Sequence, residues 1–215
     1  KNENGIYIGN YTCFAKAAYA EPTFYLDGAT WSPSGDEYAA AYLGIYDVVP
    51  SPVAGGIEIK AYIVRRVNPT IGTVTVSPVE YTIDDTTNPP TKENYIPKGV
   101  PVLLLSNNEN LTGFTTSPTT ETTTDITAAA ENSNILRIAP EDGVPVKDTE
   151  AYIFYEGEFV LAKEGTSKKD YFYFYNPNYQ AQSEPGGGSA PAPRRSLQIV
   201  VQDTETGISR IVRDE

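Results

Sequence analysis

Few residue types in this chain can carry enzyme chemistry. The 215 residues include no histidine and one cysteine, Cys13, which excludes a Ser-His-Asp triad, a Cys-His pair and a histidine-ligated metal. Glycoside hydrolysis needs only two carboxylates about 5 to 9 Å apart, and the candidate pairs are Asp36 with Glu37, Asp84 with Asp85, and Glu141 with Asp142. All these pairs lie in polar segments typical of turns, where acidic side chains cap and hydrate loops. We therefore predict that the chain is not an enzyme.

The sequence also predicts no metal and no cofactor. Oxygen ligands for calcium are abundant in short acidic segments such as Asp27-Gly28 and Asp142-Gly143, but no segment has the alternating Asp-x-Asp-x-Asp spacing of a strong calcium site. No glycine-rich phosphate loop leads from a strand into a helix, and Gly186 to Gly188 has the composition of a linker. A binding function is therefore favoured over catalysis.

Aromatic residues gather in one stretch, residues 20–56. It holds the only tryptophan, Trp31, together with several tyrosines and with Asp36 close in sequence. Aromatic rings flanked by polar groups can stack on a sugar ring or anchor a protein contact. The alternative is that these side chains fill one end of the fold. The candidate ligand-binding residues are Trp31, Tyr25, Tyr38, Tyr42 and Asp36, and the candidate ligands are a glycan or a host protein.

The overall charge narrows the choice of partners. The net charge is −12 and the isoelectric point is near 4.5, whereas nucleic-acid binding needs clustered Lys and Arg to displace counterions from phosphates. No stretch approaches the ~20 continuous apolar residues of a membrane span. We therefore predict no nucleic-acid partner and no membrane insertion by this segment. The acidic composition and the polar start at Lys1 favour a mature extracellular or cell-surface domain, with the periplasm as the alternative, and we predict a monomer.

The amino-acid pattern is that of a β-protein. The 16 Tyr and 7 Phe, with many Val, Ile and Thr, recur in short runs bounded by Gly, Pro, Asn and Asp. This pattern predicts an all-β fold, an antiparallel β-sandwich or a barrel-like domain, with at most one or two short helices. The helix candidates are Glu37 to Ala41 and a turn or two from Asp125 through Ala130. The clearest predicted strands are Ile57–Val64, Gly72–Val76, Val100–Leu105, Asn134–Ile138, Ala151–Tyr155, Glu158–Ala162, Tyr171–Tyr175 and Leu197–Val201.

Two of these strand segments predict local detail. Glu156 and Gly157 separate two β-rich runs, which predicts a hairpin because Gly157 can adopt the positive φ that a two-residue turn needs. In residues 171–175 Tyr and Phe alternate, so the tyrosines line one face of the strand and Phe172 with Phe174 line the other. We expect the phenylalanines to point into the core, and the strand to lie centrally or under cover, because it would aggregate if exposed.

The chain is predicted to form a single β domain over residues 1–203. Within it, residues 20–56 are interpreted as an insertion and residues 183–193, rich in Gly, Ser and Pro, as a surface linker. The threonine-rich stretch at residues 115–124 is too polar and too uniform to pack a core, which predicts a loop or an exposed edge strand. Residues 204–215 are interpreted as the start of a C-terminal linker.

Several strand segments, taken in order, resemble one family. The run from Ile57 to Val64, the segment from Tyr95 to Leu105, the Asn134-Ile-Leu step and the hairpin from Tyr152 to Ala162 resemble a β module common in secreted surface proteins of Bacteroidetes. The segment from Gly9 to Lys16 resembles the opening strand of that module. The resemblance implies a β domain of the kind attached to BspA-like leucine-rich repeat adhesins and to some glycoside hydrolases. It implies no catalytic residue.

These observations lead to three functional hypotheses, in order of preference. The first is a non-catalytic, secreted or cell-surface interaction or adhesion module, which predicts an exposed apolar or aromatic patch. The second is a carbohydrate-binding accessory module that uses exposed aromatic residues. The third is a glycosidase, which requires two carboxylates facing each other in a deep pocket.

Overall fold

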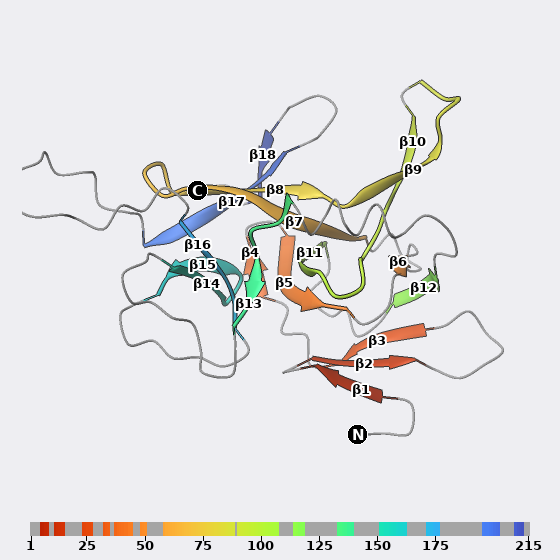
Figure 1. Ribbon diagram of the computed structural model, residues 1–215, viewed down its shortest axis with the longest axis horizontal. Coiled ribbons are helices and arrows are strands. Elements are labelled where there is room, and N and C mark those ends of the chain that lie inside the picture. Colours follow the sequence, from red (N-terminus) through yellow and green to blue (C-terminus); the bar gives the residue numbers. More distant parts are fainter. Residues whose placement is uncertain are drawn as a thin grey trace, which may run out of the picture.

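The computed structural model describes residues 5–8, 11–15, 23–27, 32–34, 37–44, 48–50, 58–88, 90–107, 114–118, 133–139, 151–162, 171–176, 195–202 and 209–212. Most of these residues belong to β-strands, which confirms the predicted all-β class (Figure 1). One large sheet of 11 strands curls on itself, and two smaller sheets complete the described structure. None of the described segments is a helix long and apolar enough to cross a bilayer.

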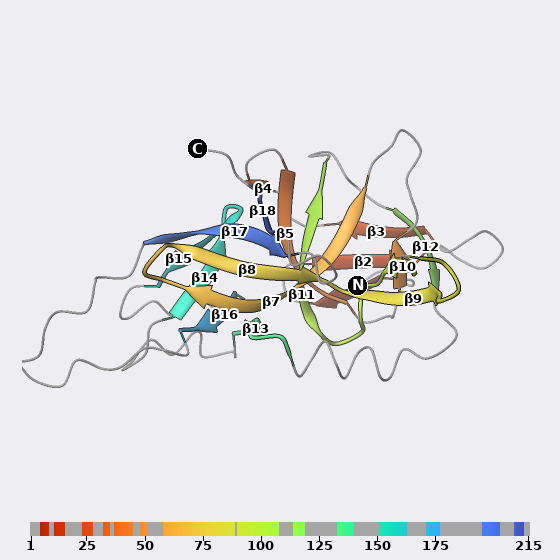
Figure 2. The ribbon, with the colours of Figure 1, turned by 90° about the horizontal axis from the view of Figure 1, so that it is seen from above.

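The large sheet has the strand order β13-β16-β14-β15-β17-β8-β7-β11-β5-β4, and β18 pairs with β17. Its described pairings are antiparallel except that of β17 with β8, which is parallel. Figure 2 shows β17, β8 and β7 side by side along the length of the molecule. The strands are β4 (Ser32–Ser34), β5 (Glu37–Leu43), β7 (Ile59–Asn68), β8 (Thr73–Pro78), β11 (Pro101–Ser106), β13 (Arg137–Ile138), β14 (Ala151–Tyr155), β15 (Glu158–Leu161), β16 (Phe172–Tyr175), β17 (Ser196–Gln202) and β18 (Ser209–Ile211).

The smaller sheets have five strands and two strands. The first has the order β1-β2-β3-β12-β6, and the second is the hairpin of β9 and β10. The hairpin projects at the upper right of Figure 1. The strands are β1 (Gly5–Ile8), β2 (Tyr11–Ala15), β3 (Thr23–Asp27), β6 (Val48–Pro50), β9 (Glu80–Asp84), β10 (Thr91–Asn94) and β12 (Phe114–Pro118).

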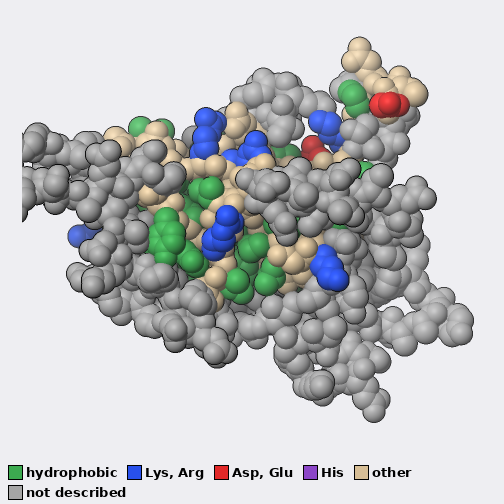
Figure 3. Space-filling view, viewed as in Figure 1, with side chains coloured by type: hydrophobic (Ala, Val, Ile, Leu, Met, Phe, Trp, Pro, Cys, Tyr) green, Lys and Arg blue, Asp and Glu red, His purple; other side chains and the backbone are tan. Residues whose placement is uncertain are grey.

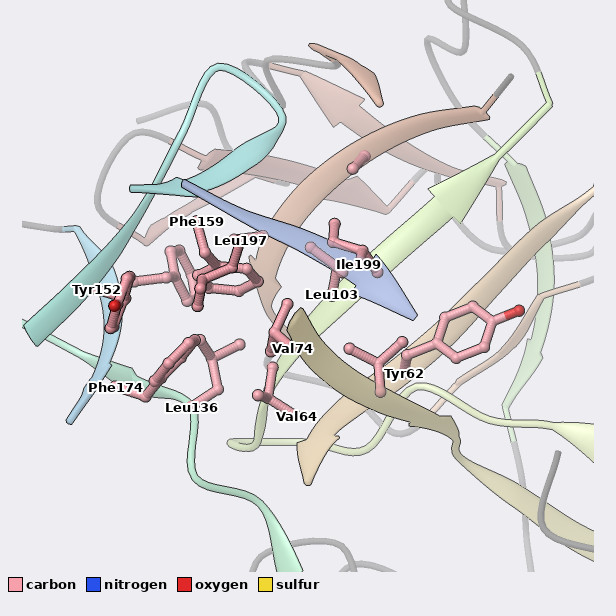
Figure 4. Packing of buried hydrophobic residues seen from close by; sticks show 14 of the residues in the cluster. Tyr62, Val64, Val74, Leu103, Leu136, Tyr152, Phe159, Phe174, Leu197 and Ile199 are labelled. Carbon is pink, nitrogen blue, oxygen red and sulfur yellow. The ribbon is translucent and has the colours of Figure 1, made fainter. Parts of the chain in front are cut away.

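The main core is the cluster of buried side chains enclosed by the curled large sheet (Figure 4). Strands β7, β8 and β11 contribute mainly Val and Leu to it, whereas β14, β15 and β16 contribute aromatic rings. Tyr152 stacks on Phe174 with ring centroids 5.6 Å apart, and Phe159 lies 4.9 Å from Phe174. These three side chains are completely buried, so the aromatic rings pack β14, β15 and β16 together at one end of the sheet.

A second core covers the opposite face of β5, β7 and β11. It is built around Tyr95, Ile96, Val102 and Leu104, which are fully buried. The three strands are therefore buried on both faces. A strand buried on both faces has a nearly continuous apolar sequence, which explains the unbroken run of leucines in β11.

Asn134 ties an irregular segment to the middle of the large sheet. The register of β7 with β8 shifts between Val64 and Arg66, which marks a β-bulge. Beside this bulge the Asn134 Oδ1 atom accepts hydrogen bonds from the backbone N–H groups of Val64 (3.0 Å) and Leu136 (3.1 Å). The Asn134 Nδ2 atom donates to the carbonyl of Pro101 at 2.6 Å. The side chain thus satisfies backbone groups of three segments in a position that is only 2% exposed.

The strand predictions from the sequence are confirmed where the structure describes them. Each of the clearest predicted strands coincides with an observed strand, with shifts of a few residues at the ends. The hairpin of β14 and β15 turns at Glu156 and Gly157, which have φ angles of 48° and 85°. Phe172 and Phe174 point into the main core, and β16 lies between β13 and β14, as expected.

The predicted helix at Glu37 to Ala41 is wrong. These residues belong to β5, which pairs with β11 on one side and with β4 on the other. Alanine has the highest helix propensity, but both faces of this segment are buried, Ala39 and Ala41 against the main core and Tyr42 against the second core. Tertiary packing therefore overrides the local preference. The predicted insertion at residues 20–56 accordingly contains a central strand of the large sheet.

Two other segments also differ from the prediction. In the threonine-rich stretch, β12 pairs with β3 through Phe114 and Thr115 and with β6 through residues 116–118, so this part is an internal strand of its sheet, whereas residues 119–124 lie outside the described residues. In the predicted C-terminal linker, β18 pairs with β17 and Val212 is buried in the main core. The helix predicted from Asp125 and the linker at residues 183–193 lie outside the described residues.

Candidate functional site

The structure describes three of the five ligand-binding residues predicted from the sequence. Trp31 and Asp36 lie outside the described residues, and for Tyr25 the structure gives its position on β3, opposite Phe14 of β2. Tyr38 is half-buried on β5, opposite Ser106 of β11. Tyr42, on the same strand, is 5% exposed and packs in the second core. A ligand-binding role for these five residues stays a prediction.

A different group of aromatic residues lies on the outer face of the β13-β16-β14-β15 end of the large sheet. We call it the tyrosine face, formed by Tyr155, Tyr171, Tyr173 and Tyr175 with Ile153. The face arises from strand alternation, because Phe172 and Phe174 point to the main core and the intervening tyrosines must point the other way. On β14 the same alternation turns Tyr152 inward and Ile153 outward.

Strand register aligns these side chains in rows. Ile153 of β14 pairs with Tyr173 of β16, and Ala151 pairs with Tyr175. The same register brings the ring of Tyr155 next to that of Tyr171, with centroids 6.4 Å apart and ring planes only 18° from parallel. Tyr173 and Tyr175 pack edge to face at 5.2 Å. The rings thus form two contacting pairs, Tyr155 with Tyr171 and Tyr173 with Tyr175, on the outer face of the sheet.

Access to the tyrosine face differs between its members. Tyr155 is 41% exposed, one of two large hydrophobic side chains with high exposure among the described residues, whereas Tyr171 and Tyr175 are half-buried. Tyr173 is 9% exposed and packs with Ala139, Ala151 and Ile153 on the outer side of the sheet. Figure 3 shows hydrophobic side chains gathered over β13 and β14, with a Lys or Arg side chain among them.

Charged residues border the tyrosine face. Arg137 pairs with Tyr173 across β13 and β16, and its guanidinium donates hydrogen bonds to the carbonyls of Asn134 (2.7 Å) and Leu136 (2.8 Å). Glu158 pairs with Tyr155 across the hairpin. A fixed cation and a carboxylate beside aromatic rings can bind polar groups of a ligand whose apolar part lies on the rings.

We expect Tyr175 to ionise at unusually high pH. Burial, followed by the charge of Tyr173 and a hydrogen bond with it, raises the pKa of Tyr175 from 10 to about 12. The stability that this neutral phenol contributes is fully present below pH 10 and is lost as the pH rises through 12. In alkaline absorbance titrations, Tyr175→Phe should lack a phenolate transition of the wild type near pH 12. If the transition missing from Tyr175→Phe lies near pH 10 instead, Tyr175 is not buried against Tyr173 as described.

The described residues show no cluster of metal-ligating side chains. They contain no group of three or more His, Cys, Asp or Glu side chains placed to hold a metal ion. Of the acidic pairs named from the sequence, Asp85 is exposed near the tip of the β9–β10 hairpin, whereas Asp36 and the pair at 141–142 lie outside the described residues. Comparison with known proteins adds no family to this picture: no protein-family model, no curated protein and no solved structure matches the chain.

Sequence reasoning identified half of the tyrosine face. The alternation in residues 171–175 predicted an outward row of tyrosines on β16. The second row depends on β14, and its alignment with β16 follows from a register that pairs Ala151 with Tyr175. Local sequence does not specify that register, because residues 156–170 separate the two strands and β15 intervenes in the chain.

Proposed function

We propose that this chain is a non-catalytic interaction module of a secreted or cell-surface protein, and that it binds its ligand through the tyrosine face. The observation that carries the proposal is the exposed ring of Tyr155, which lies nearly parallel to the half-buried ring of Tyr171 on the outer side of the large sheet. Aromatic residues dominate binding energy at protein interfaces, because a rigid ring buries a large area at a low cost in conformational entropy.

The position of the tyrosines supports a binding role over a purely structural one. The main core on the other side of β14 and β16 is already filled by Tyr152, Phe159 and Phe174. Tyr155 contributes little to that core, since 41% of its surface is exposed and its ring contacts another tyrosine of the outer face. An exposed aromatic ring held at a fixed angle by a neighbouring ring is a preorganised contact for a ligand.

A glycan is the second candidate for the ligand class, and one observation favours it. The nearly parallel rings of Tyr155 and Tyr171 could receive the C–H face of a sugar by stacking, while Arg137 and Glu158 could bind its hydroxyl groups. The first candidate is a protein ligand such as a host surface protein. The acidic composition and the absence of a basic stripe support either ligand over nucleic acid.

Replacing the exposed Tyr155 together with its half-buried neighbour Tyr171 should weaken ligand binding without unfolding the protein. We expect the double variant Tyr155→Ser/Tyr171→Ser to bind about 30-fold more weakly, which corresponds to about 2 kcal/mol for an interface hot spot. The measurement is surface binding of the purified chain to a panel of plant and mucin glycans and of collagen, fibrinogen and serum albumin. Binding to glycans alone would identify the carbohydrate-binding alternative.

The matched control is Ile71→Ser, which removes the other highly exposed hydrophobic side chain, 65% exposed between β7 and β8. This variant should bind as the wild type does. Equal loss of binding in the control and in the double variant, or wild-type binding by the double variant, would rule out the tyrosine face as the contact surface.

A further inference from the structure

A small polar pocket lies at the end of β5, β7 and β11, apart from the tyrosine face. It has a volume of about 90 Å³ and is lined by Glu37, Glu58, Lys60, Tyr62, Leu105 and Asn107, among others. Leu105 and Tyr62 belong to the main core and are 2% and 3% exposed. Figure 4 shows Tyr62 at the end of that core opposite to Tyr152 and Phe174. The pocket is therefore the polar opening of the main core.

The register of the three strands brings the polar residues together. β11 lies between β5 and β7, and Leu105 pairs with Ala39 on one side and with Lys60 on the other. Asn107 follows directly after β11, two residues beyond Leu105. The same register therefore places it opposite Glu37 on one side and opposite Glu58 on the other. A hydrogen bond confirms this position, because the Asn107 Oδ1 atom accepts from the backbone N–H of Glu58 at 3.1 Å.

The pocket combines hydrogen-bond acceptors and donors on an apolar floor. Glu37 and Glu58 supply carboxylate acceptors, and Lys60 supplies an ammonium donor 3.6 Å from the Glu58 carboxylate. The Lys60 and Glu58 side chains are 50% and 69% exposed, so their ion pair contributes little to stability and both can turn toward a ligand. Each hydroxyl group of a sugar both donates and accepts, and adjacent hydroxyls therefore match this mixed set.

The volume of the pocket limits what can enter it. The pocket of about 90 Å³ has room for only a few water molecules. Two adjacent ring hydroxyls fill such a space, whereas an entire sugar ring does not. The rest of the ring would remain outside the pocket, in solvent.

We propose that this pocket binds a vicinal pair of hydroxyl groups on the edge or at the end of a saccharide. The charges favour a neutral polyol over an organic cation, because Lys60 already places an ammonium group beside Glu58 and a second cation would have to displace it. The site is separate from the tyrosine face and does not depend on the function proposed for that face.

Titration of the full chain with free sugars tests the proposal. Glucose, galactose, mannose and fucose in the millimolar range, and methylammonium chloride separately, are added while amide NMR signals are followed. A sugar with a suitable diol should shift the backbone signal of Glu58 and the side-chain amide of Asn107. Glu58→Gln keeps the size of the side chain but removes its charge, and it should weaken the binding at least tenfold.

The matched control for the charge change is Glu80→Gln, which alters an exposed carboxylate on β9 outside the pocket and should leave sugar binding unchanged. Three results would overturn the proposal: no shift with any of the sugars, shifts confined to the tyrosine face, or binding of methylammonium in place of sugars. If the pocket does not bind sugars, the result expected for the tyrosine-face variants does not change. The two proposals are therefore tested independently.

Discussion

Replacing Phe174 by alanine should lower the free energy of unfolding by about 4 kcal/mol, within the range found for large-to-small changes in protein cores. The Phe174 ring is completely buried, stacks on Tyr152 and contacts Phe159. Its removal leaves a cavity where β16, β14 and β15 meet. The loss of stability therefore has three parts: the burial of the ring is lost, a cavity remains in the core, and two aromatic contacts disappear.

Chemical denaturation followed by circular dichroism measures this loss. The matched variant Phe174→Leu retains most of the side-chain volume and should cost less than about 2 kcal/mol. Phe174→Ala must therefore be clearly less stable than Phe174→Leu. If the two variants are equally stable, the aromatic cluster does not anchor this end of the large sheet.

Asn134→Ala should produce the second largest effect, a loss of about 3 kcal/mol. The substitution removes the partner of two backbone N–H groups, those of Val64 and Leu136, and of the Pro101 carbonyl. These groups lie beside a side chain that is 2% exposed, so water replaces the lost hydrogen bonds poorly. A buried polar group left without a partner costs about 1 to 3 kcal/mol.

Asn94 offers a matched comparison for this prediction. Its amide also makes three hydrogen bonds to backbone, accepting from Ala61 N–H and donating to the carbonyls of Ala61 and Val79, but the residue is half-buried. In Asn94→Ala both carbonyls keep a second backbone donor, the N–H groups of Val79 and Tyr95, so we expect a loss of about 1 kcal/mol. Urea unfolding of both variants gives the difference. Equal losses of unfolding free energy in the two variants would show that burial does not determine the cost of removing the Asn134 side chain.

Features with strong local signals were predictable from the sequence. The β14–β15 hairpin was predictable because Gly157 adopts positive φ, and the inward direction of Phe172 and Phe174 because alternation in a strand leaves only two faces. The helix at residues 37–41 was predicted wrongly because alanine favours helix locally. Burial of β5 between β11 and β4 outweighs that preference.

The candidate sites depend on contacts that no local pattern encodes. The tyrosine face needs the register that brings Tyr155 against Tyr171, and the polar pocket needs β11 to lie between Glu37 and Glu58. Both arrangements arise from pairing between distant strands, which depends on how the whole sheet closes. Composition alone directed attention to the stretch around Trp31, because aromatic residues are dense there.

The place of β17 in the large sheet has a consequence for the timing of folding in the cell. Thr73 to Val76 of β8 pair with Gln198 to Val201, and Phe159 of β15 pairs with Leu197. During synthesis the ribosome releases β8 and β15 well before β17, and until then both strands have unpaired backbone groups on one edge. The large sheet therefore closes only after β17 has been synthesised, which is later than for a sheet built from local hairpins.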